Sequence, residues 1–339
     1  MTLKILLVGC GGMSKKWLEV AQEIDDVALV GFVDIRLEAA EERAREFGVE
    51  GAVVDTDLER ALATAQPDIV FDCSIPEAHY PVTLAALAHG CHVLGEKPLA
   101  DTLDHAREMV AAAQSAGKLY AVMQNRRYDR HLLRLKTLIN AGKLGTLTTI
   151  NSDFYIGAHF GGFRDVMPHV LLLDMAIHTL DVARYISNAD PVSVYCKEWN
   201  PAGSWYARDA SAIAIFEMSN GLVYTYRGSW CAEGLPTTWE ADWRIIGTQG
   251  TATWDGADGL AAQIVLKADG FFSTVTDQEF PMVKARYPEG HAGVIHEFIT
   301  CVQTGEVPQT ICVDNIKSLA MVFAAIESAE RGVPVDVVW

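Results

Sequence analysis

The sequence predicts an α/β domain at residues 1–123, followed by an α+β domain at residues 124–339 whose sheet is large, open and mostly antiparallel. The chain of 339 residues is longer than one hydrophobic core usually supports. Short apolar runs alternate with amphipathic stretches up to about residue 120, as in a parallel sheet with crossover helices. Later segments are longer and rich in β-branched and aromatic residues, which is typical of antiparallel strands.

The first domain is predicted to hold five strands joined by helices. Each strand is a short apolar run, whereas each helix repeats its apolar residues at helical spacing. The strands are Lys4–Val8, Ala28–Val33, Ile69–Ser74, His92–Gly95 and Tyr120–Met123. The helices include Leu37–Phe47, Pro81–Ala88 and Leu103–Ala116. This alternation predicts a doubly wound fold.

The second domain is predicted to combine long strands with a few helices. The turn Ser219-Asn220-Gly221 indicates antiparallel pairing of the strands on either side of it. The strands are Thr146–Tyr155, Val192–Trp199, Ala212–Glu217, Leu222–Trp230 and Trp243–Trp254. The helices are Leu132–Ala141, Leu171–Ile186, His291–Thr304 and Asn315–Arg331.

Composition excludes several classes of partner. The formal charge of −17 would repel a phosphate backbone, so we expect no nucleic-acid partner. No apolar stretch approaches the roughly 20 residues that cross a bilayer, and the N-terminal run Leu3–Val8 is too short for a signal-peptide core. The seven cysteines lack any C-x-x-C spacing, which argues against a disulfide framework and a cysteine zinc site. We therefore expect a cytoplasmic protein without a membrane partner.

A glycine-rich turn follows the first predicted strand and opens a helix. The residues Gly9-Cys10-Gly11-Gly12-Met13-Ser14 match the fingerprint G-x-G-x-x-G/A, with serine as the small third residue. The first glycine permits the tight turn, and the second lets backbone N–H groups approach a pyrophosphate at the helix N-terminus. Taken alone, the motif is equally compatible with a turn that binds no ligand.

An aspartate ends the second predicted strand, about 20 residues beyond the glycine turn, where a Rossmann domain binds the adenosine ribose. The carboxylate of Asp34 can accept hydrogen bonds from both ribose hydroxyls and would repel a 2′-phosphate. We therefore expect NAD as the cofactor. NADP is the alternative, because Arg36, two residues further on, could accommodate a 2′-phosphate. If the domain binds no dinucleotide, Asp34 is simply a solvated residue at the end of a strand.

Further motifs occur in one order along almost the whole chain. They are Asp72–His79, the stretch Ala88–Ala100 with Glu96-Lys97-Pro98, Asn125-Arg126-Arg127-Tyr128, Asp174–His178 with Asp181, Ile246–Thr251 and Glu327–Gly332. In this combination the chain resembles the glucose–fructose oxidoreductase/inositol dehydrogenase (Gfo/Idh/MocA) family.

The resemblance implies a catalytic group, a cofactor site and a substrate site. The catalytic residues that it implies are Lys97, Asp174 and His178. The implied cofactor contacts are Gly9, Gly11, Gly12, Met13, Asp34, Arg36, Ser74, Pro76, His79, Glu96, Lys97 and Arg127. The implied substrate contacts are Lys97, Tyr155, His159, Asp174 and His178, with no metal ligand.

The residue patterns give independent but weaker support for a catalytic role of Lys97, Asp174 and His178. Pro98 favours extended geometry at Lys97, which lies at the end of a predicted strand. In parallel sheets ligands bind at these strand ends. A lysine in a Glu-Lys-Pro tripeptide alone, however, is usually a surface residue. Asp174, His178 and Asp181 follow the i, i+4, i+7 spacing of one helix stripe among apolar neighbours. A structural Asp–His pair is the alternative, and Asp181 fits a structural role in either case.

A glycine-rich stretch, residues 157–163, lies between the motifs and includes His159. We expect it to form a loop over the site and to set the substrate choice. Together with Asp174 and His178, His159 and His169 could also form a zinc site. The sequence has no H-x-x-x-H pair or close cluster of ligands to support it. Trp205, Tyr206 and Trp239 are candidate surfaces for stacking a sugar ring.

The expected function is reversible oxidation of a secondary hydroxyl on a sugar, cyclitol or related polyol, by an NAD(P)-dependent oxidoreductase of carbohydrate metabolism. His178 would act as the general base, and Lys97 would stabilise the developing negative charge. Two alternatives remain: a glycosidase that uses transient NAD redox, and an NAD-sensing regulator without catalysis. We expect a homodimer or homotetramer formed through the second-domain sheet.

Overall fold

The computed structural model describes residues 2–339 and divides the chain into two compact units. The first consists of the chain up to Asn125 together with Tyr287–Leu319. The second consists of Arg126–Arg286 together with Ala320–Trp339. The expected boundary between residues 123 and 124 remains a prediction about how the chain divides into domains.

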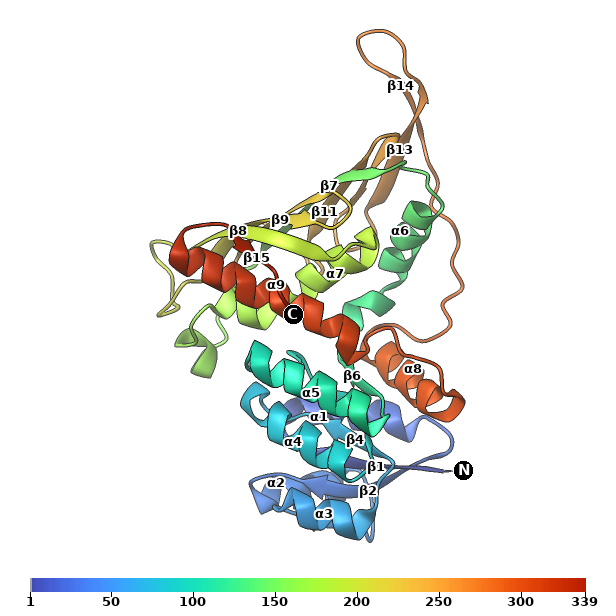
Figure 1. The fold of residues 1–339 in the computed structure, drawn as a ribbon, viewed down its shortest axis with the longest axis vertical. Helices are drawn as coiled ribbons and strands as arrows, with labels where there is room; N and C mark the ends of the chain where they lie inside the picture. The colour runs from blue at the N-terminus through green and yellow to red at the C-terminus, as the bar shows by residue number, and fades with distance from the viewer. Residues whose placement is uncertain (1) are drawn as a thin grey trace. The chain divides into compact units, whose positions relative to one another are not determined.

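A parallel sheet of six strands forms the first unit, in the order β3-β2-β1-β4-β5-β6 (Figure 1). Its strands are β1 (Leu3–Val8), β2 (Val27–Val33), β3 (Val53–Asp55), β4 (Ile69–Asp72), β5 (His92–Gly95) and β6 (Tyr120–Val122). Its helices are α1 (Gly12–Gln22), α2 (Leu37–Glu46), α3 (Leu58–Ala65), α4 (Pro76–Ala88), α5 (Leu103–Ala116), α8 (Gly290–Thr304) and the start of α9 (Cys312–Arg331). This order is the Rossmann arrangement, which confirms the predicted α/β class.

The expectation of five strands is wrong by one. Strand β3 has only three residues, too few for any periodicity to show, and α3 was likewise not predicted. The predicted strands are mostly apolar because the sheet is buried: Ile5, Leu6 and Leu7 of β1 are all 0% exposed.

A mixed sheet of nine strands forms the second unit, in the order β14-β13-β12-β11-β7-β10-β9-β8-β15. Its strands are β7 (Leu147–Tyr155), β8 (Pro191–Trp199), β9 (Ser211–Met218), β10 (Val223–Ser229), β11 (Asp242–Gly247), β12 (Gly250–Trp254), β13 (Leu260–Lys267), β14 (Thr274–Asp277) and β15 (Val335–Asp336). Only β7 and β10 pair in parallel. The prediction of a mostly antiparallel sheet is therefore confirmed, including the β9–β10 hairpin.

One predicted strand of this sheet is wrong. Residues 243–254 form two strands, β11 and β12, which pair through a hairpin that places Trp243 opposite Trp254. Both tryptophans are buried, and the turn between the two strands is Thr248-Gln249, flanked by Gly247 and Gly250. Strands β13, β14 and β15 were not predicted.

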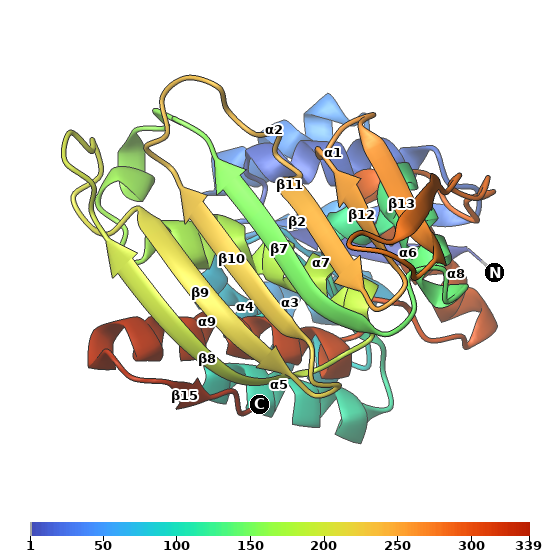
Figure 2. The same ribbon diagram turned by 90° about the horizontal axis from the view of Figure 1, so that it is seen from above.

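Helices cover one face of the nine-stranded sheet. They are α6 (Arg130–Asn140), which follows the short helix η1 (Asn125–Tyr128), and α7 (Ile177–Ser187), which packs on β7 and β10. Side chains alternate along the strands, so Phe154, Phe216 and Tyr224 are buried on this face. The opposite face, toward the viewer in Figure 2, carries Tyr195, Ile215 and their neighbours, and we call it the outer face.

Within residues 2–339, no helix is both long enough and apolar enough to span a bilayer.

Candidate active site

The glycine turn brings the ends of β1 and β4 into close contact. Gly9 has φ +84°, and a Cβ on it would lie 2.6 Å from the backbone of Cys73 and Ser74. Only glycine fits both the conformation and the contact. Gly11 and Gly12, by contrast, have open space where a Cβ would point. That space lies at the N-terminus of α1, where N–H groups without intrahelical partners can bind a phosphate.

The carboxylate of Asp34 lies beside this turn. Its Oδ2 accepts from the backbone N–H of Cys10 at 2.8 Å, and its Oδ1 accepts from that of Arg36 at 2.9 Å. The Arg36 side chain is 72% exposed, with its Nε 3.9 Å from Asp34 Oδ1. The backbone thus fixes the carboxylate at the turn where the fingerprint requires it.

A cavity of about 300 Å³ opens next to the turn. It is lined by Cys10, Gly11, Gly12, Arg36, Glu38, Ala39, Glu42, Arg43 and Glu46. Arg43, which the sequence analysis missed, donates to the backbone carbonyls of Cys10 and Gly11 at 3.3 and 3.0 Å. A helix N-terminus, an open glycine turn and an oriented carboxylate fit the pyrophosphate and ribose of a dinucleotide.

The turn that carries Lys97 is held by buried side chains of the first unit. Glu96 is 8% exposed; its Oε1 accepts from Trp17 Nε1 at 2.8 Å, and its Oε2 accepts from the Lys97 backbone N–H at 3.2 Å. His79 is 1% exposed, and its ring nitrogens lie 2.8 Å from the Pro98 carbonyl and 3.2 Å from the Ser74 carbonyl. His79 and Glu96 therefore fix this turn, whatever contact they make with a cofactor.

Three other predicted cofactor contacts lie at helix starts or turns. Ser74 donates its N–H and its hydroxyl to Asp72 Oδ1 at 3.0 and 2.5 Å, which closes the turn after β4. Pro76 is the first residue of α4, and Met13 lies in the first turn of α1 with 48% of its surface exposed. Their contacts with a dinucleotide remain predictions.

The helix that carries Asp174 and His178 does not begin as predicted. Residues Leu171–Ala176 form a π-helix, and α7 begins only at Ile177. The stripe argument assumed α-helical spacing, but a π turn is wider, so the continuous α-helix from Leu171 is wrong in its first turns. Single π turns are frequent at functional sites.

The two aspartates of the stripe have different arginine partners. Asp174 accepts from Arg164, which lies in the short helix η2 (Gly162–Asp165), through Nε–Oδ2 at 2.8 Å and Nη2–Oδ1 at 3.2 Å. Asp181 accepts from Arg127 at 2.7 and 2.6 Å, and both of those side chains are almost fully buried. Arg127 therefore anchors α7, and its expected contact with the cofactor remains a prediction.

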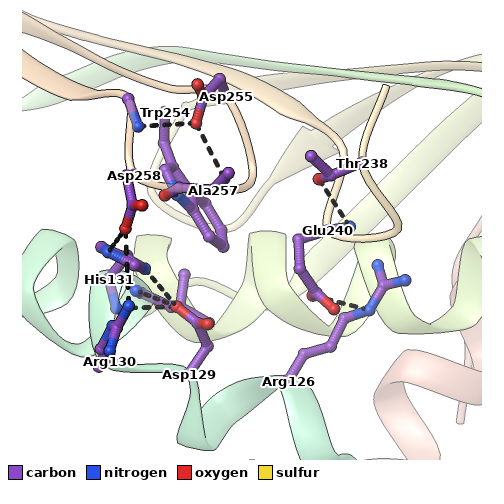
Figure 3. A network of polar contacts seen from close by, with 12 residues as sticks. Arg126, Asp129, Arg130, His131, Thr238, Glu240, Trp254, Asp255, Ala257 and Asp258 are labelled. Atoms are coloured by element: carbon purple, nitrogen blue, oxygen red, sulfur yellow. Dashed lines mark hydrogen bonds and ion pairs between the residues drawn. The ribbon is translucent and has the colours of Figure 1, made fainter. Parts of the chain in front are cut away.

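Its neighbour Arg126 ties the same helix to the loop before β11 (Figure 3). Arg126 Nε lies 3.0 Å from Glu240, and its Nη groups reach Thr179 Oγ1 at 3.2 Å and Met175 Sδ at 3.7 Å. Burial lowers the pKa of the Arg126 guanidinium, and Glu240 opposes this shift. Figure 3 also shows a second cluster around His131 and Asp258, 3.1 Å apart, to which no predicted site residue belongs.

The glycine-rich loop is anchored in the second unit. His159 Nε2 lies 2.8 Å from Glu233, and the His159 ring stacks on Trp205 with centroids 3.7 Å apart. Trp205 and Tyr206 both donate to the Ala158 carbonyl, at 2.9 and 2.6 Å. These two aromatic side chains therefore fix the loop, and their role in stacking a sugar remains untested.

Tyr155 lies elsewhere. It follows Phe154, which is buried on the helix face of β7, so its side chain points to the outer face. Burial and then Asp153 raise the pKa of the Tyr155 hydroxyl, whereas Arg227 lowers it, which places it among these outer-face charges. Its expected contact with a substrate remains a prediction.

His169, the residue behind the zinc reading, pairs with carboxylates. Its Nδ1 lies 2.6 Å from Glu198 of β8, and its Nε2 lies 3.5 Å from Glu330 of α9. Within residues 2–339, no three His, Cys, Asp or Glu side chains gather as metal ligands would. His169 instead joins β8 and α9 to the segment that precedes the π-helix.

Comparison with known proteins identifies the class. Residues 3–124 match the GFO/IDH/MocA oxidoreductase family with its NAD-binding Rossmann fold, and residues 132–253 match the GFO/IDH/MocA C-terminal domain. The chain belongs to the GFO/IDH/MocA family of NAD-binding oxidoreductases.

Among its relatives, a D-glucoside 3-dehydrogenase of Escherichia coli is 31% identical over 243 residues, which cover 65% of this chain and 68% of that protein. An inositol 2-dehydrogenase of Saccharopolyspora erythraea is 30% identical over 269 residues, or 77% of this chain and 76% of its own length. An oxidoreductase from Agrobacterium radiobacter in complex with NAD⁺, L-tartaric acid and magnesium shares the fold, with TM-score 0.84, 22% identity and 99% of both chains covered.

Proposed function

We propose that the chain is an NAD-dependent dehydrogenase that oxidises a secondary hydroxyl of a sugar, cyclitol or related polyol, with NADP as the alternative cofactor. The observation that carries the cofactor choice is the Asp34 carboxylate, held by the backbone N–H groups of Cys10 and Arg36 beside the glycine turn. A 2′-phosphate at this position would meet a fixed negative charge. The proposed class of substrate, a sugar or cyclitol, is supported by the two relatives named as a D-glucoside 3-dehydrogenase and an inositol 2-dehydrogenase.

The proposed chemistry divides between a cofactor and side chains of this chain. NAD⁺, when bound, accepts a hydride from the carbon that carries the hydroxyl. His178 would take the hydroxyl proton as general base, and Lys97 would donate a hydrogen bond to the same oxygen as negative charge develops there. Asp174 would accept hydrogen bonds from substrate hydroxyls and so orient the sugar.

Screening sugars, inositols and sugar acids for NADH absorbance tests the proposal. With the best substrate, His178→Ala and Lys97→Ala should each lower kcat by roughly 10²-fold or more, while NAD affinity changes little. His89→Ala is the matched control, because His89 is exposed and pairs with the surface carboxylate of Glu59. Near wild-type turnover in both variants would assign these residues structural roles.

The same screen separates the alternatives. Release of sugar from a glycoside without net NADH would establish redox-assisted bond cleavage. Tight NAD binding without turnover of any polyol would favour a regulator.

We also propose that the second-domain sheet forms the contact of a homodimer or homotetramer. The outer face of β8 and β9 exposes between 38% and 44% of the surface of four large apolar side chains, Tyr195, Trp199, Ile213 and Ile215. Contiguous apolar side chains of this kind usually mark an interface.

A further inference from the structure

Four aromatic side chains of the second unit pack against one another. Phe154 of β7 and Trp230, which follows β10, meet edge to face with ring centroids 5.1 Å apart, and both are buried. Phe160 of the glycine-rich loop and Trp239 of the loop before β11 cover them, with ring centroids 5.2 and 5.7 Å from that of Trp230. Phe160 and Trp239 are themselves 43% and 50% exposed, respectively. We call these two exposed rings the aromatic wall.

Phe160 joins the aromatic wall to a predicted site residue. The Arg164 guanidinium lies over the Phe160 ring, 4.9 Å from its centre, and donates to both carboxylate oxygens of Asp174. Such stacking leaves the N–H groups in the plane of the guanidinium available to the carboxylate. One side of the aromatic wall is therefore fixed beside the π-helix that carries Asp174.

Trp239 is tied to the same stretch of helix by separate contacts. Arg126 donates to the Trp239 backbone carbonyl, and its side chain also reaches Met175 Sδ at 3.7 Å and Thr179 Oγ1 at 3.2 Å. Met175 and Thr179 each directly follow one of the two predicted catalytic residues of this helix. Glu240 pairs with Arg126 at 3.0 Å (Figure 3), which holds the loop that carries Trp239. Both members of the aromatic wall are thus anchored next to the predicted substrate contacts.

The aromatic wall is separate from the outer face of the sheet. Trp239 contacts Phe154, which is buried on the helix face, with ring centroids 6.4 Å apart. The apolar side chains that we assign to the contact between subunits lie on the opposite face. Exposed aromatic rings beside a few polar groups are typical of a small-molecule site.

The geometry of the aromatic wall limits what can bind to it. The centroids of Phe160 and Trp239 lie 6.4 Å apart, and their planes are inclined by 51°. One flat group cannot stack on both rings, because it cannot lie parallel to both planes at once. Two flat groups joined by a bond that allows rotation can do so. A sugar joined to an apolar aglycone through a glycosidic bond has this form.

We propose that the substrate is a glycoside with a flat apolar aglycone: one ring of the aromatic wall stacks on the sugar that is oxidised, and the other stacks on the aglycone. This inference rests on the proposed function, which places the reacting sugar at Asp174 and His178. A free monosaccharide or cyclitol would cover only one of the two rings and would leave the other in water. The aromatic wall therefore selects for the group attached to the sugar, whereas the polar residues select the hydroxyl.

The test measures binding without turnover. Methyl and phenyl glycosides of glucose, galactose and mannose are titrated into protein saturated with NADH, which cannot accept a hydride, and saturation-transfer NMR gives each Kd. For at least one sugar, the wild type should bind the phenyl glycoside about tenfold more tightly than the methyl glycoside. Trp239→Ala and Phe160→Ala should each reduce this ratio to about twofold or less, and Trp239→Phe should retain most of it.

Phe272→Ala is the matched control. Phe272 lies between β13 and β14, is 82% exposed and packs edge to face on Phe271, so its loss should leave the ratio unchanged. A ratio near one for all three sugars in the wild type would overturn the inference, as would an undiminished ratio in both alanine variants or an equal loss in Phe272→Ala. If the ratio is as expected but no glycoside or free sugar reduces NAD⁺, the proposed function alone fails. If polyols reduce NAD⁺ while the ratio is near one, only this inference fails.

Discussion

Replacing Gly9 with alanine should separate the structural demand of the glycine turn from its ligand-binding demand. The φ of +84° costs an L-residue roughly 1–2 kcal/mol, and the new Cβ would lie 2.6 Å from the backbone of Cys73 and Ser74. Neither strand end can give way without moving the sheet, so overpacking adds about 1–3 kcal/mol. We expect Gly9→Ala to lose about 2–5 kcal/mol of unfolding free energy.

The matched variant is Gly11→Ala. Gly11 is the N-cap of α1, with φ −71° and no atom within 4 Å of an added Cβ, so Gly11→Ala should lower the free energy of unfolding by only about 1 kcal/mol, the cost of alanine at an N-cap. The methyl group would nevertheless occupy the space at the α1 N-terminus where a pyrophosphate binds, so NAD affinity should fall at least about tenfold.

Urea unfolding followed by circular dichroism measures the stability of both variants, and calorimetric titration with NAD⁺ measures their affinity. Hydrogen exchange should localise the loss in Gly9→Ala to peptides that contain β1 and β4. If Gly9→Ala unfolded at the wild-type midpoint, the close approach of these strand ends would be wrong. If Gly11→Ala bound NAD⁺ normally, the pyrophosphate would have to bind elsewhere.

Other predictions concern the cofactor, the core, pH and assembly. Asp34→Ala should narrow the preference for NAD over NADP; a wild type that prefers NADP at equal ionic strength contradicts the assignment. Asp181→Leu should lower the free energy of unfolding by about 3–5 kcal/mol, because it removes the buried carboxylate to which Arg127 donates, and Arg127→Leu/Asp181→Leu should recover part of that loss in urea unfolding. The hydrogen bond between His169 and Glu198 of β8 raises the pKa of His169. The stability that this pair contributes to the fold is therefore complete below the ordinary pKa of histidine and is lost as the pH rises through the folded-state pKa. The melting temperature should therefore fall more between pH 6 and pH 8.5 in the wild type than in His169→Gln. Ile215→Lys should lower the mass found by light scattering, and a wild-type monomer at micromolar concentration would reject the outer-face contact.

Local patterns were sufficient to predict most of the fold. The Rossmann strands are largely buried and therefore form nearly continuous apolar runs, and the β9–β10 hairpin was evident from Ser219-Asn220-Gly221. Patterns failed where an element was too short or too exposed to show any: β3 has three residues, and β14 has all four of its residues exposed. The π-helix Leu171–Ala176 was missed for another reason: all of its residues except Asp174 are apolar, so no periodicity separates a π turn from an α turn.

The site was predictable only where a backbone motif defines it. The fingerprint and the strand-end aspartate depend on residues close in sequence, and the structure places the Asp34 carboxylate against Cys10 of the glycine turn. Arg43 and Arg164 were missed because their partners are set by tertiary approach: Arg43 reaches the glycine turn from α2, and Arg164 reaches Asp174 from a loop. No spacing rule relates an arginine in an irregular loop to a carboxylate on a helix.

The first unit is built from two segments that are far apart in the sequence, and this affects folding during synthesis on the ribosome. Strand β6 lies at one end of the six-stranded sheet, where Val122 donates to the Thr310 carbonyl at 3.0 Å and Ala121 bridges Ile311. That partner segment is translated only after the whole stretch Arg126–Arg286. The edge of β6 therefore stays uncovered throughout that interval, and uncovered edges invite pairing with other chains. A fragment ending near residue 125 should accordingly aggregate unless residues 287–319 are supplied with it.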